Sequence, residues 1–227
     1  MSGLEREESV NQAGDGHQQK CRFCGSRVTR SFVDLGMSPL CEEFVPATKL
    51  NHMERFFPLH AVVCDDCLLV QVDEYVTADE IYTEYAYFSS YSDSWVEHAR
   101  RYAEMMCESA SLSDQSFVVE LASNDGYLLQ HFAKAGIPVL GVEPAANVAT
   151  AAVKKGIPTV NKFFGVNTAR ELVAEYPQPD LLVGNNVLAH VPDLNDFVAG
   201  MKILLKDDGR ITMEFPHLLR LIEQNQY

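Results

Sequence analysis

Basic residues are scarce in this chain of 227 residues. Its 18 lysines and arginines stand against 32 aspartates and glutamates, which gives a formal net charge of -14 at pH 7. A protein that binds the phosphate backbone of DNA or RNA needs clustered basic side chains to displace counterions. The sequence has no such cluster. We therefore expect no nucleic acid among the partners of this protein.

Long apolar stretches are also missing. No run reaches the roughly 20 apolar residues that cross a bilayer, and residues 1–20 lack the apolar core of a signal peptide. Within residues 1–20, the only aliphatic side chains larger than alanine are Met1, Leu4 and Val10. Such a segment buries too little apolar surface to offset its ordering entropy, so we expect a disordered tail. We expect a cytoplasmic protein without membrane contact.

Cysteines are few, but four of the six form two Cys-x-x-Cys pairs. These are Cys21, Cys24, Cys64 and Cys67. Each pair places two sulfurs on one tight turn, and two such turns complete a tetrahedral four-thiolate zinc site with no open position. A redox motif would not come in duplicate. We predict a structural zinc site that stabilises a small zinc-binding domain over residues 21–76, whose apolar residues could form only a small core.

The rest of the chain changes from a helical pattern to alternating strands and helices. Residues 77–116 form a predicted helical connector, with apolar and aromatic residues three and four apart from Trp95 to Met106. Strands are expected at 117–121, 138–142, 159–160, 180–184 and 210–215, with helices between them. Repeated strand–helix units of this length predict an α/β fold, with a parallel sheet covered by helices on both faces.

The glycine fingerprint Gly-x-Gly-x-x-Gly is absent after the first predicted strand. The segment Glu120–Gly126 offers side chains where a dinucleotide pyrophosphate needs bare backbone, so a cofactor without phosphates fits better. The second predicted strand ends at Glu143, whose carboxylate could accept both hydrogen bonds from a ribose diol. Together these features favour S-adenosylmethionine over a nicotinamide cofactor. A glutamate at a solvated strand end is the alternative interpretation of Glu143.

Several motifs in one order resemble a known family, the sugar C-methyltransferases, which methylate a carbon of nucleotide-linked deoxyketosugars. Besides the four cysteines, the motifs are Asp34–Leu40, Tyr85–Ser92, Ser123–Gly126, Gly141–Pro144 and Asn185–His190. The resemblance implies a Rossmann-like class I methyltransferase domain over residues 117–227. It also implies that the chain lacks the family's C-terminal part, with its Tyr-His-Glu-His segment and catalytic base. The last predicted strand would then expose an edge, to be covered by a partner or by a further domain.

The resemblance also assigns roles to individual residues. Residues expected to hold the cofactor are Glu120, Ala122, Asn124 and Asp125 for its methionine part, Glu143 and Pro144 for the ribose, Phe163 and Phe164 for the adenine, and Asn185, Asn186 and Leu188 below it. Tyr87 and Ser90 would close over the sulfonium, and His190 would face the substrate. Ala122 replaces a glycine that is usual in the family.

In the reaction that the resemblance implies, a base removes the proton beside a ketone and the enolate takes up the methyl group. His190 and Tyr87 are the candidate catalytic residues of this chain. A histidine that only caps the following helix and a tyrosine that only fills the core are the alternatives. The other functions considered are a methyltransferase for another small molecule, RNA or protein, and a non-catalytic cofactor-binding module.

Overall fold

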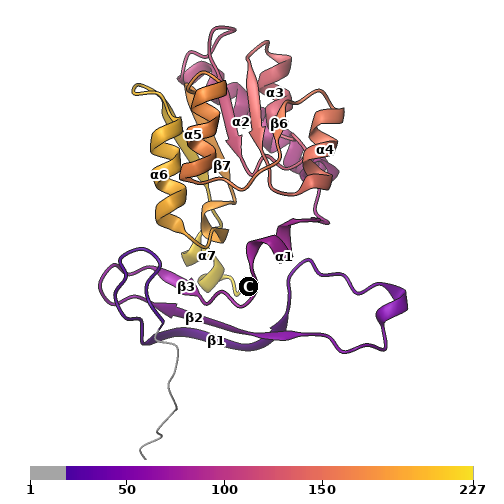
Figure 1. The fold of residues 1–227 in the computed structure, drawn as a ribbon, viewed down its shortest axis with the longest axis vertical. Helices are drawn as coiled ribbons and strands as arrows, with labels where there is room; N and C mark the ends of the chain where they lie inside the picture. Colours follow the sequence, from indigo (N-terminus) through magenta and orange to yellow (C-terminus); the bar gives the residue numbers. More distant parts are fainter. Residues whose placement is uncertain (1–18, 227) are drawn as a thin grey trace, which may run out of the picture. The chain divides into compact units, whose positions relative to one another are not determined.

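The computed structural model describes residues 19–226 and divides them into two compact units (Figure 1). The first unit consists of residues 19–36 and 59–73, and the second of residues 37–58 and 74–226. The two units are thus interleaved along the chain, unlike the contiguous ranges expected from the sequence. Most of the expected tail lies outside the described residues, and Lys20 near its end forms a β-bridge with Arg27. No helix in the described part has the length and apolar character needed to cross a bilayer.

The first unit is built on a small sheet with the strand order β1-β2-β3. The strands are β1 (Arg30–Pro39), β2 (Phe56–Val63) and β3 (Val70–Val72). β2 and β3 run antiparallel, with Ala61 opposite Val72. The core of this unit contains Val28 and Val62 besides buried cysteines, which is very little apolar surface. A unit with so small a core needs a metal or another cross-link for stability.

The second unit contains a five-stranded parallel sheet with the order β6-β5-β4-β7-β8. Its strands are β4 (Val118–Leu121), β5 (Val139–Val142), β6 (Thr159–Val160), β7 (Leu181–Asn185) and β8 (Arg210–Glu214). The strands β4 and β5 are buried at every position, as expected for a parallel sheet that is covered on both faces. The α/β fold and all five strand positions predicted from the sequence are confirmed.

Helices cover both faces of this sheet (Figure 1). They are α2 (Asp93–Ser109), α3 (Leu129–Lys134), α4 (Ala146–Lys154), α5 (Val166–Glu175) and α6 (Leu194–Leu204), and the short helices are α1 (Ala78–Tyr82), α7 (Leu218–Glu223), η1 (Ala47–Lys49), η2 (Ser89–Tyr91) and η3 (Leu188–His190). Alternate residues of β4 divide between two cores: Val118 packs with α2 and α3, whereas Val119 packs with α5 and α6.

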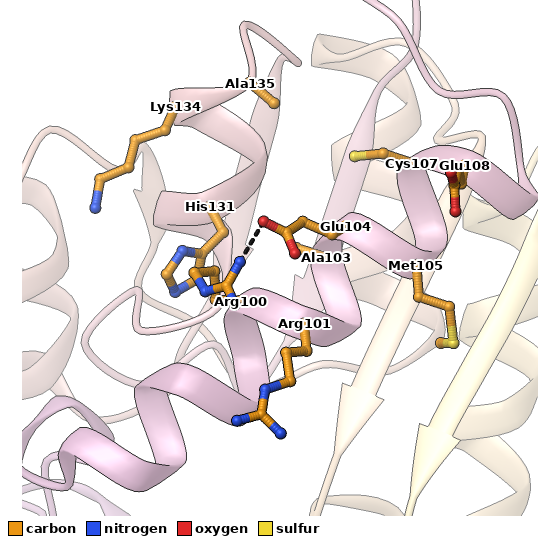
Figure 2. A pocket seen from close by; sticks show the side chains of 10 residues that line it. All are labelled: Arg100, Arg101, Ala103, Glu104, Met105, Cys107, Glu108, His131, Lys134 and Ala135. Carbon is orange, nitrogen blue, oxygen red and sulfur yellow. Dashed lines mark hydrogen bonds and ion pairs between the residues drawn. The ribbon is translucent and has the colours of Figure 1, made fainter.

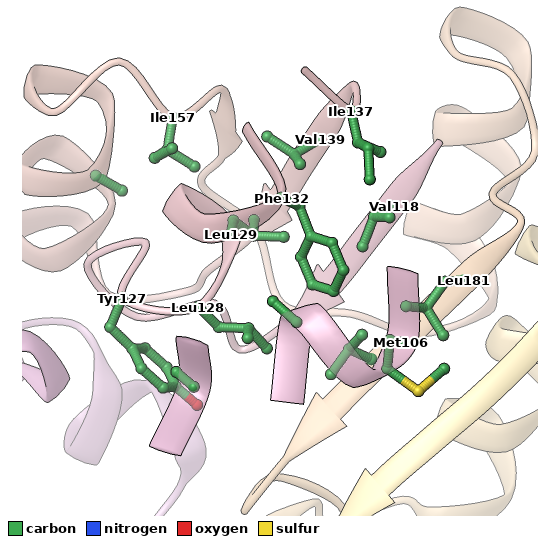
Figure 3. Close-up of a cluster of buried hydrophobic side chains, with 14 residues drawn as sticks. Met106, Val118, Tyr127, Leu128, Leu129, Phe132, Ile137, Val139, Ile157 and Leu181 are labelled. Atoms are coloured by element: carbon green, nitrogen blue, oxygen red, sulfur yellow. The ribbon is translucent and has the colours of Figure 1, made fainter. Parts of the chain in front are cut away.

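The helix α2 has a charged outer face and an apolar inner face. On the outer face Arg100 pairs with Glu97 and Glu104, beside a groove that α2 and α3 line together (Figure 2). On the inner face Ala99, Ala103 and Met106 are buried at helical spacing. The core that they join is centred on Phe132 and Leu129 of α3, with Val118 and Leu181 of the sheet nearby (Figure 3).

The expected helical connector is helical only in parts. The helices α1, η2 and α2 lie within it, but residues 83–88 leave the helical conformation between α1 and η2. Ser92 starts α2 by accepting a hydrogen bond from the backbone N–H of Trp95. The non-helical stretch is bound by side chains from the sheet loops, which are described below.

Candidate cofactor cavity and zinc centre

The second unit contains a cavity of about 560 Å³ at the carboxyl ends of β4, β5 and β7. Every residue that lines it belongs to residues 37–58 or 74–226. The chain runs from β4 to β5 and β6 on one side, and then crosses to β7 and β8 on the other side of β4. Such a switch point is where open α/β sheets bind their ligands, because the connections leave the sheet on opposite faces there. The fold therefore places a cavity at the sheet edge where the sequence predicted a cofactor.

The loop after β4 forms one wall of the cavity through Ala122 and Asn124. Both residues have positive φ angles, 55° and 49°, and Gly126 follows with 77°. Non-glycine residues rarely adopt this conformation, so the loop is held in a strained shape by its surroundings. A φ of 55° at Ala122 is a conformation that glycine adopts without steric cost.

Glu143 lies at the end of β5 and is almost fully buried. Its carboxylate accepts hydrogen bonds from the backbone N–H groups of Asn124 at 2.9 Å and Ala145 at 2.8 Å. Burial raises the pKa of Glu143, and these two hydrogen bonds oppose the rise. Each oxygen accepts one backbone bond and retains a lone pair, so the carboxylate could still receive the two hydroxyls of a ribose.

Glu120 is completely buried below this loop and has no hydrogen-bond partner among the described residues. The hydroxyl of Ser123 is equally buried and unpartnered. Burial raises the pKa of Glu120 well above its ordinary value, and the nearby carboxylates of Glu143 and Asp125 raise it further. Neither group lines the cavity, but unpartnered acceptors directly beneath its wall are typical of ligand sites. The residues present therefore fit a cofactor with a ribose diol and an amino-acid part.

The end of β7 supplies a further part of the wall. Asn185 and Asn186 line the cavity, and Asn186 again has a positive φ of 51°. His190 follows in η3 and also lines the cavity. It is exposed on one side, but partial burial against the wall lowers its pKa. An imidazole with a lowered pKa is neutral near pH 7 and can donate one N–H to a carbonyl oxygen.

A connecting segment, Tyr85–Ser92, runs along the loop after β4, and we call it the strap. Asn124 accepts a hydrogen bond from the backbone N–H of Ser89 at 2.8 Å and donates to the carbonyl of Tyr87 at 3.1 Å. Asn147 of α4 pairs in the same way with both backbone groups of Tyr85. The side chains of the sheet loops thus replace the hydrogen bonds that a helix would have given the strap.

An ion pair between a buried carboxylate and an exposed lysine fixes the other end of the strap. Asp125 is 1% exposed, accepts hydrogen bonds from the backbone and hydroxyl of Ser90, and pairs with Lys155 at 2.7 Å. The ammonium group of Lys155 also donates to the hydroxyl of Ser90 at 2.7 Å. The hydroxyl of Ser90 is therefore engaged below the strap, and the neighbouring Ser89 lines the cavity instead.

The structure brings most of the residues predicted for the cofactor site together. The predicted residues that line the cavity are Tyr87, Ala122, Asn124, Glu143, Pro144, Phe163, Phe164, Asn185, Asn186 and His190. Four others, Ser90, Glu120, Asp125 and Leu188, do not line it. Ser90 and Asp125 instead hold the strap, Glu120 lies beneath the loop, and Leu188 packs against the core beside α5 and α6.

Sequence reasoning missed several residues of the cavity wall. They are Cys41, Glu42, Tyr82, Tyr85, Ser89, Trp95 and Tyr127, among others. Trp95 and Tyr127 are stacked, with ring centroids 6.2 Å apart, and both also pack in the core. In the sequence, helical spacing identified Trp95 only as a core residue, and Cys41 showed no pattern at all. No local signal places residues 41 and 42 beside a sheet that begins at residue 118.

The zinc centre consists of the four predicted cysteines, whose sulfur atoms lie within 4.8 Å of one another. Two turns of equal geometry present them. Gly25 and Leu68 donate backbone hydrogen bonds to the carbonyls of Cys21 and Cys64, and both have positive φ angles, 77° and 66°. Hydrogen bonds from Ser26 lower the pKa of the Cys24 thiol to about 6, towards the thiolate that zinc binds. The donor set is that of a closed, structural zinc site.

A five-stranded parallel sheet with this order and a cavity at its switch point define a class I, S-adenosylmethionine-dependent methyltransferase domain. Residues 119–211 match the model of a methyltransferase domain family, and residues 21–82 match that of a family described as a putative zinc binding domain. The chain thus combines a zinc-binding domain with an S-adenosylmethionine-dependent methyltransferase domain.

The chain is 32% identical over 208 residues to the C-methyltransferase NovU of Streptomyces niveus. The match covers 92% of this chain and 50% of NovU, so the chain spans about half the length of that relative. Among solved structures, the PH0226 protein of Pyrococcus horikoshii OT3 is similar, with a TM-score of 0.50, 18% identity and coverage of 62% of each chain. At this identity, the last similarity supports the fold alone.

Proposed function

We propose that the protein transfers the methyl group of S-adenosylmethionine to a carbon beside the ketone of a nucleotide-linked deoxysugar. The observation that supports this most is the 32% identity with a C-methyltransferase over both the zinc-binding and the methyltransferase domain. The cavity agrees with it, because groups suited to the ribose and the methionine of the cofactor lie in one space with His190.

Different residues of the cavity wall would bind different parts of the cofactor and of the substrate. Glu143 would hold the ribose diol, and Phe163 and Phe164 would contact the adenine. When bound, S-adenosylmethionine supplies a methyl group activated by the sulfonium charge. His190, whose pKa is lowered by partial burial, would donate an N–H to the ketone oxygen of the sugar. This hydrogen bond strengthens as the oxygen becomes an enolate, so it would favour removal of the neighbouring proton.

Two residues would keep the reacting groups in place. Tyr87 lines the cavity and is 45% exposed, so its ring can cover a ligand from the side of the strap. The hydrogen bonds of Asn124 to the strap backbone fix the position of this tyrosine. Holding two reactants in a near-attack arrangement is one of the larger contributions an enzyme makes to rate.

The test combines binding with turnover. Calorimetry with zinc-loaded protein should show saturable binding of S-adenosylmethionine and S-adenosylhomocysteine. NAD, the control, should give no binding heat. Incubation with S-adenosylmethionine labelled in its methyl group and a nucleotide-linked ketodeoxyhexose should then give a labelled sugar, detected by mass spectrometry. Transfer of the label to an unrelated small molecule, with none to the sugar, would replace the proposed substrate class. Binding without any transfer would favour a non-catalytic cofactor-binding module.

A further inference from the structure

The wall of the cavity includes a row of three tyrosines that precede the parallel sheet in the sequence. Tyr82 is the last residue of α1, and Tyr85 and Tyr87 belong to the strap. All three line the cavity. The ring centroids of Tyr82 and Tyr85 are 5.5 Å apart, and those of Tyr85 and Tyr87 are 6.3 Å apart. Tyr87 has a part in the proposed function, whereas Tyr82 has none so far.

Tyr82 lies at the end of the row that is near Glu143. Burial raises the pKa of the Tyr82 phenol, and the negative charges of the nearby Cys41 and Glu143 raise it further. Both neighbours also line the cavity. A phenol with a raised pKa keeps its proton at neutral pH and can donate it in a hydrogen bond. The wall of the cavity therefore has a hydroxyl donor near the carboxylate that is expected to hold the ribose.

Backbone contacts fix the same end of the row. Asn147 of α4 donates to the carbonyl of Tyr85 at 2.8 Å and accepts its backbone N–H at 3.1 Å. Asn147 lies two residues after Ala145, whose backbone N–H binds the carboxylate of Glu143 at 2.8 Å. The segment with Tyr82 and Tyr85 is thus attached to the part of the chain that positions the Glu143 carboxylate.

The hydroxyl of Tyr82 has no hydrogen-bond partner among the described residues, although the side chain is partly buried. The hydroxyl of Tyr102, which is also partly buried, bonds to the hydroxyl of Thr212. A phenylalanine would fill the same space as Tyr82 without leaving a polar group unpaired. An unpaired hydroxyl in the wall of a ligand cavity indicates that the ligand provides its partner.

We propose that the hydroxyl of Tyr82 donates a hydrogen bond to a ribose hydroxyl of the cofactor, which in turn donates to Glu143. A ribose hydroxyl that donates its proton to a carboxylate still has lone pairs on its oxygen, and these require a donor. The carboxylate of Glu143 only accepts, so the donor must be another group. This inference rests on the cofactor of the proposed function, and it makes Tyr82 a residue that selects the cofactor by its ribose.

The experiment measures the binding of S-adenosylhomocysteine to zinc-loaded wild type, Tyr82→Phe and the control Tyr91→Phe by calorimetry. Tyr91 is 80% exposed and does not line the cavity. We expect Tyr82→Phe to bind S-adenosylhomocysteine about five- to tenfold more weakly, because one hydrogen bond to the ligand is lost. Tyr91→Phe should bind it with an affinity within about twofold of the wild type.

Two analogues of S-adenosylhomocysteine, 2′-deoxy and 3′-deoxy, distinguish a hydrogen bond from a change in ring packing. For the analogue that lacks the bonded hydroxyl, wild type and Tyr82→Phe should differ less than about twofold, because neither complex has the hydrogen bond. For the other analogue, the loss in Tyr82→Phe should remain about five- to tenfold. An equal loss with all three ligands would overturn the hydrogen bond, because it would show that only the packing of the ring had changed.

These measurements do not require methyl transfer, so the two proposals can fail separately. Selective loss with one analogue, in a protein that transfers no methyl group to the ketosugar, would support the role of Tyr82 and overturn the proposed function. Methyl transfer by the wild type, with unchanged cofactor affinity in Tyr82→Phe, would support the proposed function and overturn the role of Tyr82. If the zinc-loaded wild type binds neither S-adenosylmethionine nor S-adenosylhomocysteine, both proposals fail.

Discussion

Several single residues in the wall of the cofactor cavity or beneath it adopt conformations or surroundings that cost stability. Ala122, Asn124 and Asn186 have positive φ angles, and Glu120 is buried without a partner among the described residues. Such costs commonly gather at binding sites, where they keep groups in position for a ligand. From the sequence, Glu120 could be selected by its place in a buried strand and Ala122 by its place directly after that strand. Their strain could not be predicted, because it depends on the loop geometry.

Ala122→Gly should stabilise the protein by about 1 kcal/mol, because glycine adopts a φ of 55° without steric cost. The matched control is Ala133→Gly in the exposed part of α3, where the same change should cost up to about 1 kcal/mol. Urea unfolding of both variants measures the difference. Equal destabilisation by the two substitutions would show that the strain at Ala122 is absent.

Glu120→Gln should change how stability depends on pH in the absence of cofactor. The folded protein raises the pKa of Glu120, so it retains a proton that the unfolded chain releases above about pH 4.5. The wild type therefore loses up to about 1.4 kcal/mol per pH unit from this group as the pH rises towards the folded pKa. Glutamine removes that loss.

In urea unfolding, Glu120→Gln should therefore gain stability relative to the wild type between pH 5 and pH 8, and little near pH 4. The same variant should bind S-adenosylmethionine at least tenfold more weakly at pH 8. Glu143 is titrated in both proteins, so its contribution largely cancels in the comparison. A stability difference that stays constant from pH 4 to pH 8 would contradict the buried, protonated state of Glu120.

At the scale of elements, the strap is the feature that the sequence predicted least well. The helical spacing from Trp95 to Met106 was correct for α2, and hydrophobic runs identified all five strands of the parallel sheet. Residues 83–88 offered no such pattern, because side chains from distant loops determine their conformation. Asn124, Asp125 and Asn147 act over 35 to 62 residues in the sequence, and no local rule detects such pairings.

Lys155→Met should loosen the strap, because it removes the partner of the buried carboxylate of Asp125 and one hydrogen bond to Ser90. We expect the dissociation rate of S-adenosylmethionine to rise about tenfold, measured by stopped-flow fluorescence. Removing one partner of a buried charge pair typically costs several kcal/mol of stability. The cost should be smaller here, because Lys155 is exposed to solvent. Lys154→Met is the matched control, since that neighbouring side chain is exposed.

Lys155→Arg should restore slow dissociation in large part, since it retains the charge. Hydrogen exchange of the amides of Ser89 and Ser90 should increase in Lys155→Met and stay unchanged in Lys154→Met. If both methionine variants release the cofactor at the same rate as the wild type, the ion pair does not hold the strap in place.

At the scale of the whole molecule, we expect zinc binding and cofactor binding to be largely independent of each other. All four thiolates belong to the first unit and every residue lining the cavity belongs to the second. Chelation of zinc should therefore unfold the first unit, because structural zinc supplies on the order of 10 kcal/mol to a unit with so small a core. Cofactor affinity should fall by less than about tenfold.

Cys64→Ser should reproduce the effect of the chelator, whereas Cys107→Ser, which changes a cysteine outside the cluster, should retain one zinc per chain. Zinc content, cofactor affinity and thermal unfolding are measured on the same samples. Complete loss of cofactor binding in zinc-free protein, with an intact parallel sheet by circular dichroism, would show that the two sites depend on each other.

Residues 37–58, which run from the end of β1 to the start of β2, also bear on how such proteins diversify. Cys41 and Glu42 of this insertion line the cofactor cavity, although the strands on either side of it belong in part to the zinc unit. A recombination event that exchanges the N-terminal segment as a block therefore also replaces part of the cavity wall. Variation in this N-terminal segment can thus change the wall of the cavity, without a single change in the parallel sheet.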